Sequence, residues 1–215
     1  LELFEKAYHW KGYVKRRLNR YLGDEVLEVG AGIAGTTQVL NDGMARRWVC
    51  LEPDAELADR IGARVADGLL PANCEVVAGT VWDLGPSQFD TVLYMDVLEH
   101  IEEDRLEVVR AAQLIRPGGH LIVLAPAHQW LFTAFDASIG HYRRYDSDSL
   151  KRMTPSDMDL ARCEYLDSVG LLASLGNRLL LKQDMPTERQ IAVWDRLMVP
   201  ASRFVDVMTC FSLGK

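Results

Sequence analysis

Apolar runs alternate with helix-spaced segments along the first 127 residues of the chain. Five runs predict strands, at residues 25–30, 47–53, 74–79, 89–96 and 120–127. Their apolar residues are continuous rather than alternating, which is typical of a parallel sheet covered on both faces. Helical segments separate most of them. The order predicts an α/β fold of the doubly wound, Rossmann-like kind, with a mostly parallel sheet and helices on both faces.

The helical segments differ in how clearly they mark a core face. Over 54–68, Leu57, Ile61 and Val65 recur at helical spacing, and Asp54 is expected to cap the helix. A shorter helix after Gly35 is expected to end near Asn41. For a helix over 101–119, the spacing predicts a core face made of Leu106, Val109, Ala112 or Gln113, and Leu114.

The two ends of the chain do not follow this alternation of strands and helices. Residues 1–22 are basic and aromatic and predict a helical lid, followed by the main fold at 23–170. That fold includes a long aromatic loop at 128–147, a short helix at 149–153 with Ser147 as a candidate cap, and a sixth strand at 161–169. Residues 171–215 are expected to form a helical extension of the same domain.

The apolar extension leaves three interpretations open. One helical stripe would contain Trp194, Leu197, Met198, Ala201, Phe204, Val205 and Met208. We expect this stripe to pack on the chain's own sheet, which is the usual role of an amphipathic helix. The alternatives are an oligomer interface or a peripheral contact with a membrane or lipid-linked acceptor, for which the interspersed arginines would suit an anionic surface.

Composition narrows the class of protein. The chain has 215 residues, 48% of them hydrophobic, and a net charge of −7, which disfavours a nucleic-acid partner. Four scattered cysteines are expected to be buried thiols, and we expect no bound metal. No apolar run is long enough to span a membrane, so the default setting is cytoplasmic. Whether the native chain extends beyond either end is left open.

The stretch VLEVGAGIAGTT, residues 26–37, links the first strand to a glycine turn. GAGIAG fits the dinucleotide-binding pattern, which would place a pyrophosphate at the turn. Glu28 lies just before the turn and would repel phosphate, whereas it would suit an ammonium group. Glu52 ends the second strand, where a carboxylate can bind ribose hydroxyls. An adenosine that carries an amino acid, without phosphate, fits both acids.

At this point the ordered motifs VLEVGAG, LEPD, FDTVLYMDVLEHI and LIRPGGHLIVLAPA resemble class I S-adenosylmethionine-dependent methyltransferases over about residues 20–127. GHYRRY, residues 140–145, resembles a further signature of one bacterial branch of that superfamily. The resemblance implies methyl transfer from S-adenosylmethionine, with S-adenosylhomocysteine as product. The acceptor would be a small molecule, such as a sugar, a lipid-linked glycan or a secondary metabolite.

The resemblance also implies a set of cofactor contacts. They are Glu28, Gly30 and Gly32 at the methionine portion, Glu52 at the ribose, Pro53, Thr80 and Val81 at the adenine, and Met95 and Asp96 under the methionyl chain. Two positions depart from the family. Ala34 stands where a third glycine is usual, and Thr80 stands where an aspartate often contacts the adenine.

The candidates for proton transfer and acceptor binding lie after the fourth and fifth strands. His141 is the first choice of general base, and His100 is the second, although a packing and capping role is the commoner one for His100. The remaining candidates for contact with the acceptor are Tyr8, Tyr13, His128, Tyr142, Arg143 and Arg144. An alternative for the GHYRRY loop is a structural ion pair with Asp136, Asp146 or Asp148.

Two further expectations concern the whole fold. The chain stops at FSLGK, where the family's antiparallel seventh strand should begin, so we expect that strand to be absent. Two rival functions remain, a nicotinamide-dependent oxidoreductase and a non-catalytic cofactor-binding module, because fold alone does not decide function. The sequence does not identify the acceptor, the attacking atom or the oligomeric state.

Overall fold

The computed structural model describes residues 6–85, 89–176 and 187–215 and divides into two compact units. The first unit consists of Val14–Leu98 and Glu103–Leu124. The second consists of the described parts of Glu2–Tyr13, Glu99–Glu102 and Ala125–Lys215. The predicted cofactor contacts therefore all belong to the first unit, and the GHYRRY loop belongs to the second.

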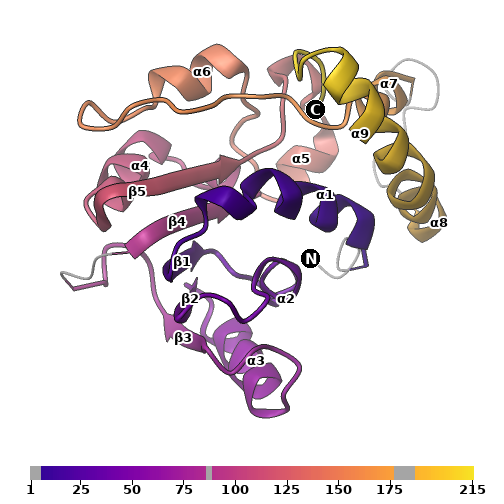
Figure 1. Cartoon of the computed structure of the whole chain (residues 1–215). Coiled ribbons are helices and arrows are strands. Elements are labelled where there is room, and N and C mark those ends of the chain that lie inside the picture. Colours follow the sequence, from indigo (N-terminus) through magenta and orange to yellow (C-terminus); the bar gives the residue numbers. More distant parts are fainter. Residues whose placement is uncertain (1–5, 86–88, 177–186) are drawn as a thin grey trace. The chain divides into compact units, whose positions relative to one another are not determined.

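Five strands form the sheet of the first unit (Figure 1). They are β1 Glu25–Val29, β2 Arg47–Glu52, β3 Cys74–Ala78, β4 Phe89–Met95 and β5 Ile115–Leu124. Their order is β3-β2-β1-β4-β5, and all four pairs are parallel. The order reverses beside β1, and doubly wound folds bind ligands at this switch point, at the carboxyl ends of the strands. The predicted α/β sheet is confirmed, and no antiparallel strand occurs within the described residues.

The central strand β1 is buried along its whole length. Val26 lies opposite Trp48 of β2 and Thr91 of β4, and all three are almost completely inaccessible. Strands covered on both faces need apolar side chains on both, which explains the continuous apolar runs of the sequence. The thiols of Cys50 and Cys74 are buried in the same core, as predicted, whereas Cys163 is half-buried and Cys210 is exposed, so the prediction of four buried thiols is wrong for these two.

Helices cover both faces of the sheet. α2 Thr37–Leu40 and α3 Ala55–Ala66 follow β1 and β2, and α4 Asp104–Ala112 follows β4. Right-handed crossovers place α2 and α3 on one face and α4 on the other. The Asp54 carboxylate accepts the N–H groups of Glu56 and Leu57, so the predicted cap of α3 is confirmed.

The predicted helix over 101–119 is wrong in its bounds and in its core face. α4 ends at Ala112, and the residues from Ile115 onward belong to β5. Leu106 and Val109 are exposed, whereas Glu107 is buried. The Glu107 carboxylate accepts the Tyr94 hydroxyl at 2.9 Å and the Trp82 indole N–H at 3.1 Å. Because these hydrogen bonds satisfy it, an acid takes the core position that an apolar pattern cannot reveal.

The second unit is mainly helical. Its described elements are η4 Gln129–Leu131, α5 Ala134–Ser138, α6 Ser147–Arg152, α7 Ser168–Gly176, α8 Glu188–Val193, the π-helix η6 Trp194–Met198, and α9 Val199–Met208. α1 Tyr8–Leu18 and the 3₁₀ turn η3 Leu98–His100 cross the boundary between the units. After α1, η2 Asn19–Tyr21 completes the predicted N-terminal helical segment as far as it is described.

Buried acids hold the second unit together. Asp206 accepts the Tyr13 hydroxyl at 2.8 Å and the backbone N–H groups of Asp167 and Ser168. Asp167 in turn accepts the Trp194 indole N–H at 2.7 Å. Because buried carboxylates must be hydrogen-bonded, these contacts fix α9 to the part of α1 that belongs to this unit and to the start of α7.

The predicted sixth strand at 161–169 is wrong. This segment has no ladder to any strand of the described chain, and α7 begins at Ser168. Its backbone pairs instead with the end of the chain, since the Tyr165 N–H donates to Phe211 O at 3.0 Å and the Lys215 N–H donates to Leu166 O at 2.8 Å. A segment becomes a strand only where a neighbouring strand pairs with its backbone.

The predicted cap of α6 is also wrong by one residue. The Asp146 carboxylate accepts the Ser149 N–H at 2.7 Å, and the Ser149 hydroxyl lies 2.9 Å from the Asp146 N–H. This reciprocal capping box makes Ser147 the first helical residue.

The expected core stripe of the C-terminal helices lies largely on the exposed side. Leu197, Phe204 and Met208 are 67%, 69% and 69% exposed. The buried side instead contains Ile191 and Val199 together with polar residues such as Asp206. The buried face of the C-terminal helices contains hydrogen-bonded carboxylates, so the apolar stripe does not coincide with the buried face.

Candidate cofactor and acceptor sites

The glycine turn after β1 is tied to the end of β2. Gly30 and Gly32 have φ angles of 66° and 61°, a left-handed region in which glycine carries no steric cost. The N–H groups of Gly30 and Ala31 both donate to Leu51 O, at 2.8 and 3.2 Å. A Cβ at Gly30 would lie 2.7 Å from the Val97 side chain, so this position excludes any side chain.

Glu52 is the acid that the glycine turn holds in place. Its Oε2 accepts the Gly32 N–H at 2.7 Å, and its Oε1 accepts the Asp54 N–H at 3.1 Å. The side chain is buried, so its orientation is fixed before any ligand arrives. Each carboxylate oxygen can accept a second hydrogen bond. A pair of adjacent hydroxyl donors, such as a ribose diol, therefore matches this carboxylate.

These contacts also bear on the pyrophosphate alternative. The N–H groups of Gly30, Ala31 and Gly32 are all donated to groups at the end of β2. A pyrophosphate at a glycine turn is bound through free backbone N–H groups. The donor chemistry of this turn therefore fits a ribose and an uncharged or cationic group better than it fits a phosphate.

Glu28 lies in the core beneath the turn. Its Oε2 accepts the Thr37 hydroxyl at 2.7 Å and the Trp48 indole N–H at 2.8 Å. The structure thus gives Glu28 a definite structural task, which is to join β1 to α2 and β2. Its expected contact with the methionine portion of a cofactor stays a prediction.

The other expected cofactor residues lie at or after the ends of β2, β3 and β4. Pro53 and Asp96 are exposed, Thr80 and Met95 are half-buried, and Val81 is buried. The Thr80 N–H and hydroxyl both donate to Asp83 Oδ2, each at 2.8 Å. An aspartate, Asp83, therefore lies beside Thr80, three residues further along the chain.

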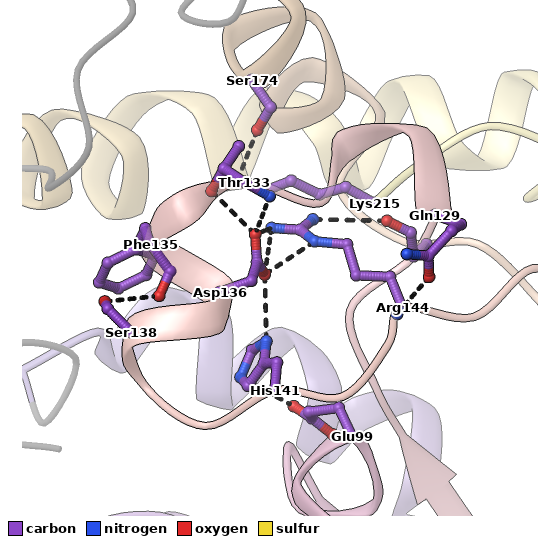
Figure 2. Close-up of polar contacts among 11 residues, drawn as sticks. Glu99, Gln129, Thr133, Phe135, Asp136, Ser138, His141, Arg144, Ser174 and Lys215 are labelled. Atoms are coloured by element: carbon purple, nitrogen blue, oxygen red, sulfur yellow. Dashed lines mark hydrogen bonds and ion pairs between the residues drawn. The ribbon is translucent and has the colours of Figure 1, made fainter.

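In the second unit, Asp136 is the centre of the polar contacts that hold the GHYRRY loop (Figure 2). This buried carboxylate accepts the Thr133 N–H at 2.8 Å, the Arg144 Nε–H at 2.9 Å, and His141 Nδ1 lies 3.0 Å away. Burial, the largest influence, raises the pKa of Asp136, but the hydrogen bond from His141 and the charge of Arg144 outweigh it and hold the pKa well below its usual range. The structural ion pair with Asp136, one of the three alternatives, is confirmed.

His141, His100 and Glu99 lie together at one end of this network. The rings of His100 and His141 are 4.5 Å apart, edge to face, and His141 Nε2 lies 3.9 Å from Glu99 Oε1. Burial, followed by the charge of His141, lowers the pKa of His100 and favours its neutral form. One potential ligand atom from each residue lies within 4.8 Å of the others, so among the described residues this trio could hold a metal ion. No motif in the sequence marks Glu99, since its burial depends on the fold.

The remaining acceptor candidates have diverse surroundings. His128 Nε2 lies 2.8 Å from Gly214 O, and its ring stacks on Tyr165. Arg143 donates to the carbonyl groups of Ile101 and Glu102, and its guanidinium lies over the ring of the exposed Tyr142. These contacts order the loop, and none of them by itself identifies an acceptor.

The two N-terminal tyrosines differ sharply. Tyr8 is exposed, whereas Tyr13 is buried and donates its hydroxyl to Asp206. Tyr13 therefore anchors α1 within the second unit. The predicted role of both residues at the acceptor stays a prediction, and the exposure of Tyr8 makes it the better candidate.

A comparison with known protein families finds a match for the part of the chain that contains this sheet. A family model described as a methyltransferase domain matches residues 27–123, from β1 to β5. Over these 97 of its 215 residues, the chain is therefore similar to a methyltransferase domain. S-adenosylmethionine is the cofactor of this family. The match runs from β1 to β5, so the similarity coincides with the sheet of the first unit.

Two relatives are about a quarter identical to the chain over the aligned segments. The demethylmenaquinone methyltransferase of Tropheryma whipplei (strain Twist) is 27% identical over 172 residues, which cover 76% of this chain and 65% of the relative. The ubiquinone biosynthesis O-methyltransferase of Cronobacter sakazakii is 27% identical over 158 residues, covering 68% and 63%. The chain thus spans slightly less than two thirds of the length of either relative.

Solved structures agree with the methyltransferase domain in fold. The YcgJ protein of Bacillus subtilis superposes with a TM-score of 0.58 at 15% identity, covering 66% of this chain and 65% of that protein. The mitomycin 7-O-methyltransferase MmcR superposes with a TM-score of 0.55 at 16% identity, covering 70% and 46%. At this level of identity the likeness shows the fold alone.

Within the described residues, no helix combines the length and the apolar character needed to cross a membrane.

Proposed function

We propose that the chain transfers a methyl group from S-adenosylmethionine to a small-molecule acceptor by in-line displacement. The observation that carries this proposal is the buried Glu52 carboxylate, held by the glycine turn and by Asp54, at the switch point of a methyltransferase domain. Glu52 would bind the ribose hydroxyls, and Gly30 and Gly32 would let the methionine portion approach the backbone.

The other expected contacts complete this binding site. Thr80 and Val81, with Pro53, would border the adenine, while Met95 and Asp96 would lie under the methionyl chain beside Glu28. When bound, S-adenosylmethionine supplies an activated methyl group on a sulfonium, so the protein's main task is to orient the attacking atom. The residues of this chain bind and position the reactants, and they accept a proton where the acceptor must lose one.

His141 is the proposed proton acceptor. Its Nδ1 is bound by Asp136, which fixes the ring and its tautomer, so Nε2 is the nitrogen that can accept a proton. His100, whose lowered pKa favours the neutral form, is the second candidate. Asp136 is a positioning residue here, because it acts on the reaction through His141.

The acceptor is proposed to be a small organic molecule with a nucleophilic group. One relative is named for demethylmenaquinone and the other as an O-methyltransferase of ubiquinone biosynthesis, which supports a small acceptor and includes ring hydroxyls among the options. Tyr8, Tyr13, His128, Tyr142, Arg143 and Arg144 are the residues proposed to surround it. Sugars, lipid-linked glycans and secondary metabolites stay within this class, and oligomerisation through the C-terminal helices stays a proposal.

Calorimetric titration separates this function from its two rivals. We expect S-adenosylmethionine and S-adenosylhomocysteine to bind and NADH not to bind. Replacing Glu52 by Ala removes both ribose contacts and should weaken binding of the two sulfur ligands about 10- to 100-fold, as expected for loss of charge-assisted hydrogen bonds worth about 1.5–3 kcal/mol. Glu56→Ala, on the exposed side of α3, is the matched control and should bind normally.

Other outcomes would point elsewhere. Binding of NADH alone would favour the oxidoreductase. Tight binding of S-adenosylmethionine without formation of S-adenosylhomocysteine, over a broad set of phenols, amines and sugars, would favour the non-catalytic module.

A further inference from the structure

The last helical stretch of the chain presents an apolar and basic face to solvent. α8, η6 and α9 follow one another without a break from Glu188 to Met208 (Figure 1). The exposed apolar side chains on this stretch are Val193, Leu197, Phe204, Val207 and Met208. Arg189, Arg196 and Arg203 are exposed beside them, and they recur every seven residues, which places them on one side of a helix. We call these eight residues the apolar–basic face.

The acids of the same stretch are turned away from this face. Asp195 and Asp206 are 4% and 0% exposed. Asp195 accepts the backbone N–H groups of His9 and Trp10, and Asp206 accepts the Tyr13 hydroxyl. Glu188, at the first residue of α8, is the exposed acid of the stretch. The exposed side is therefore cationic, although the chain as a whole carries a net charge of −7.

The three arginines have no acidic partner in the described part of the chain. No ion pair or side-chain hydrogen bond joins Arg189, Arg196 or Arg203 to another described residue, whereas Arg144 and Arg116 each have a carboxylate partner. An arginine that stabilises the fold usually shows such a partner. These three arginines are thus available to an anionic ligand outside the molecule.

We propose that the apolar–basic face docks the protein on an anionic lipid surface. A helix that lies in a membrane interface combines large apolar side chains with a border of Arg or Lys, and both attract it to anionic lipids. Phe204, Leu197 and Met208 would enter the boundary between headgroups and acyl chains, while the arginines contact lipid phosphates. A second copy of the same face would bring three more arginines and only Glu188 as an exposed acid. Its charge would therefore repel the arginines of the first copy.

Vesicle co-sedimentation of the full chain tests this proposal. Vesicles of phosphatidylcholine alone are compared with equimolar phosphatidylcholine and phosphatidylglycerol. We expect binding only to the vesicles with phosphatidylglycerol, and weaker binding at high salt. The double variant Arg196→Gln/Arg203→Gln should bind about 25-fold more weakly, because each basic residue near an anionic surface contributes about fivefold, or about 1 kcal/mol.

A second variant tests the apolar part of the face independently. Leu197→Ser/Phe204→Ser keeps the charge and should also lose most vesicle binding. Arg105→Gln/Leu106→Ser, an exposed pair on α4, is the matched control and should bind as the wild type does. The four side chains that these two test variants replace are all exposed. Circular dichroism should therefore show unchanged helix content in both test variants.

The proposal is overturned if anionic vesicles do not retain the wild-type chain, or if the control variant loses binding as strongly as the two test variants. It is also overturned if light scattering shows a dimer that Leu197→Ser/Phe204→Ser dissociates while vesicles bind none of the proteins. That result would assign the face to a second copy of the chain.

Discussion

Ala34 occupies a backbone conformation that suits glycine. It has a φ of 59° and no exposed surface, and it stands where the family usually has its third glycine. The left-handed region costs a residue with a Cβ about 1–2 kcal/mol. The fold therefore tolerates local strain in the turn that carries the proposed cofactor contacts.

We expect Ala34→Gly to leave the free energy of unfolding unchanged or to raise it by up to about 1 kcal/mol, because relief of the strain outweighs a buried methyl worth about 0.8 kcal/mol. The control is Ala31→Gly, in the same turn and buried, but without a left-handed φ. It should lower the free energy of unfolding by about 1 kcal/mol or more. Urea unfolding of both variants measures the difference, and equal losses would contradict the argument.

At the scale of elements, Asp90 at the start of β4 joins three strands. Its Oδ2 accepts the Glu25 N–H of β1 at 2.9 Å, and its Oδ1 accepts Arg116 Nη1–H of β5 at 2.9 Å. Burial, the largest influence, raises the pKa of Asp90, but these hydrogen bonds and the Arg116 charge together lower it below its usual range. This end of the sheet therefore depends on an ionised carboxylate.

The pH dependence follows from the sign of that shift. A carboxyl group with a lowered folded-state pKa stabilises the fold fully above its unfolded pKa, about 3.9, and the stabilisation is lost as pH falls through the folded value. We expect Asp90→Asn to unfold at lower urea than the wild type at neutral pH, with a smaller gap at about pH 3. Asp59→Asn, on the exposed side of α3, should show no gap at either pH. A gap for Asp90→Asn that does not change with pH would contradict the ionic role.

At the scale of the whole molecule, the proposed chemistry needs no metal ion. His141 is oriented by Asp136, so it can accept a proton without a metal-bound hydroxide. Once an acceptor is found, we expect turnover to be unchanged after treatment with a chelator. Loss of turnover that one divalent cation restores would instead assign Glu99, His100 and His141 to a metal site, because these residues have the required spacing.

The net charge of the chain differs in sign from the local charge of the apolar–basic face. The net charge of −7 describes the chain as an average, and it predicts repulsion from an anionic surface. The apolar–basic face shows that a local arrangement can have the opposite sign, because the fold buries Asp195 and Asp206 and leaves the arginines outside.

Local patterns in the sequence determined much of this protein. Continuous apolar runs predicted all five strands and the parallel sheet, since burial on both faces leaves no room for alternation. The glycine turn and the acid of β2 were identified from spacing, because a left-handed turn requires glycine at defined positions. The cap Asp54 was predicted because an N-cap binds backbone N–H groups within three residues of itself.

Only the tertiary structure decided which polar residues are buried and what they bind. Glu107 in the core binds Tyr94 of β4, and Asp206 on the buried side of α9 binds Tyr13 of α1. The fold also selected Asp136 from the three acids that could pair with the GHYRRY loop. The segment 161–169 failed to become a strand because its partners are Phe211 and Lys215. In the C-terminal stretch, hydrogen bonds to distant residues bury the acids Asp195 and Asp206 and leave the apolar stripe exposed. Hydrophobic periodicity carries no information about such hydrogen bonds.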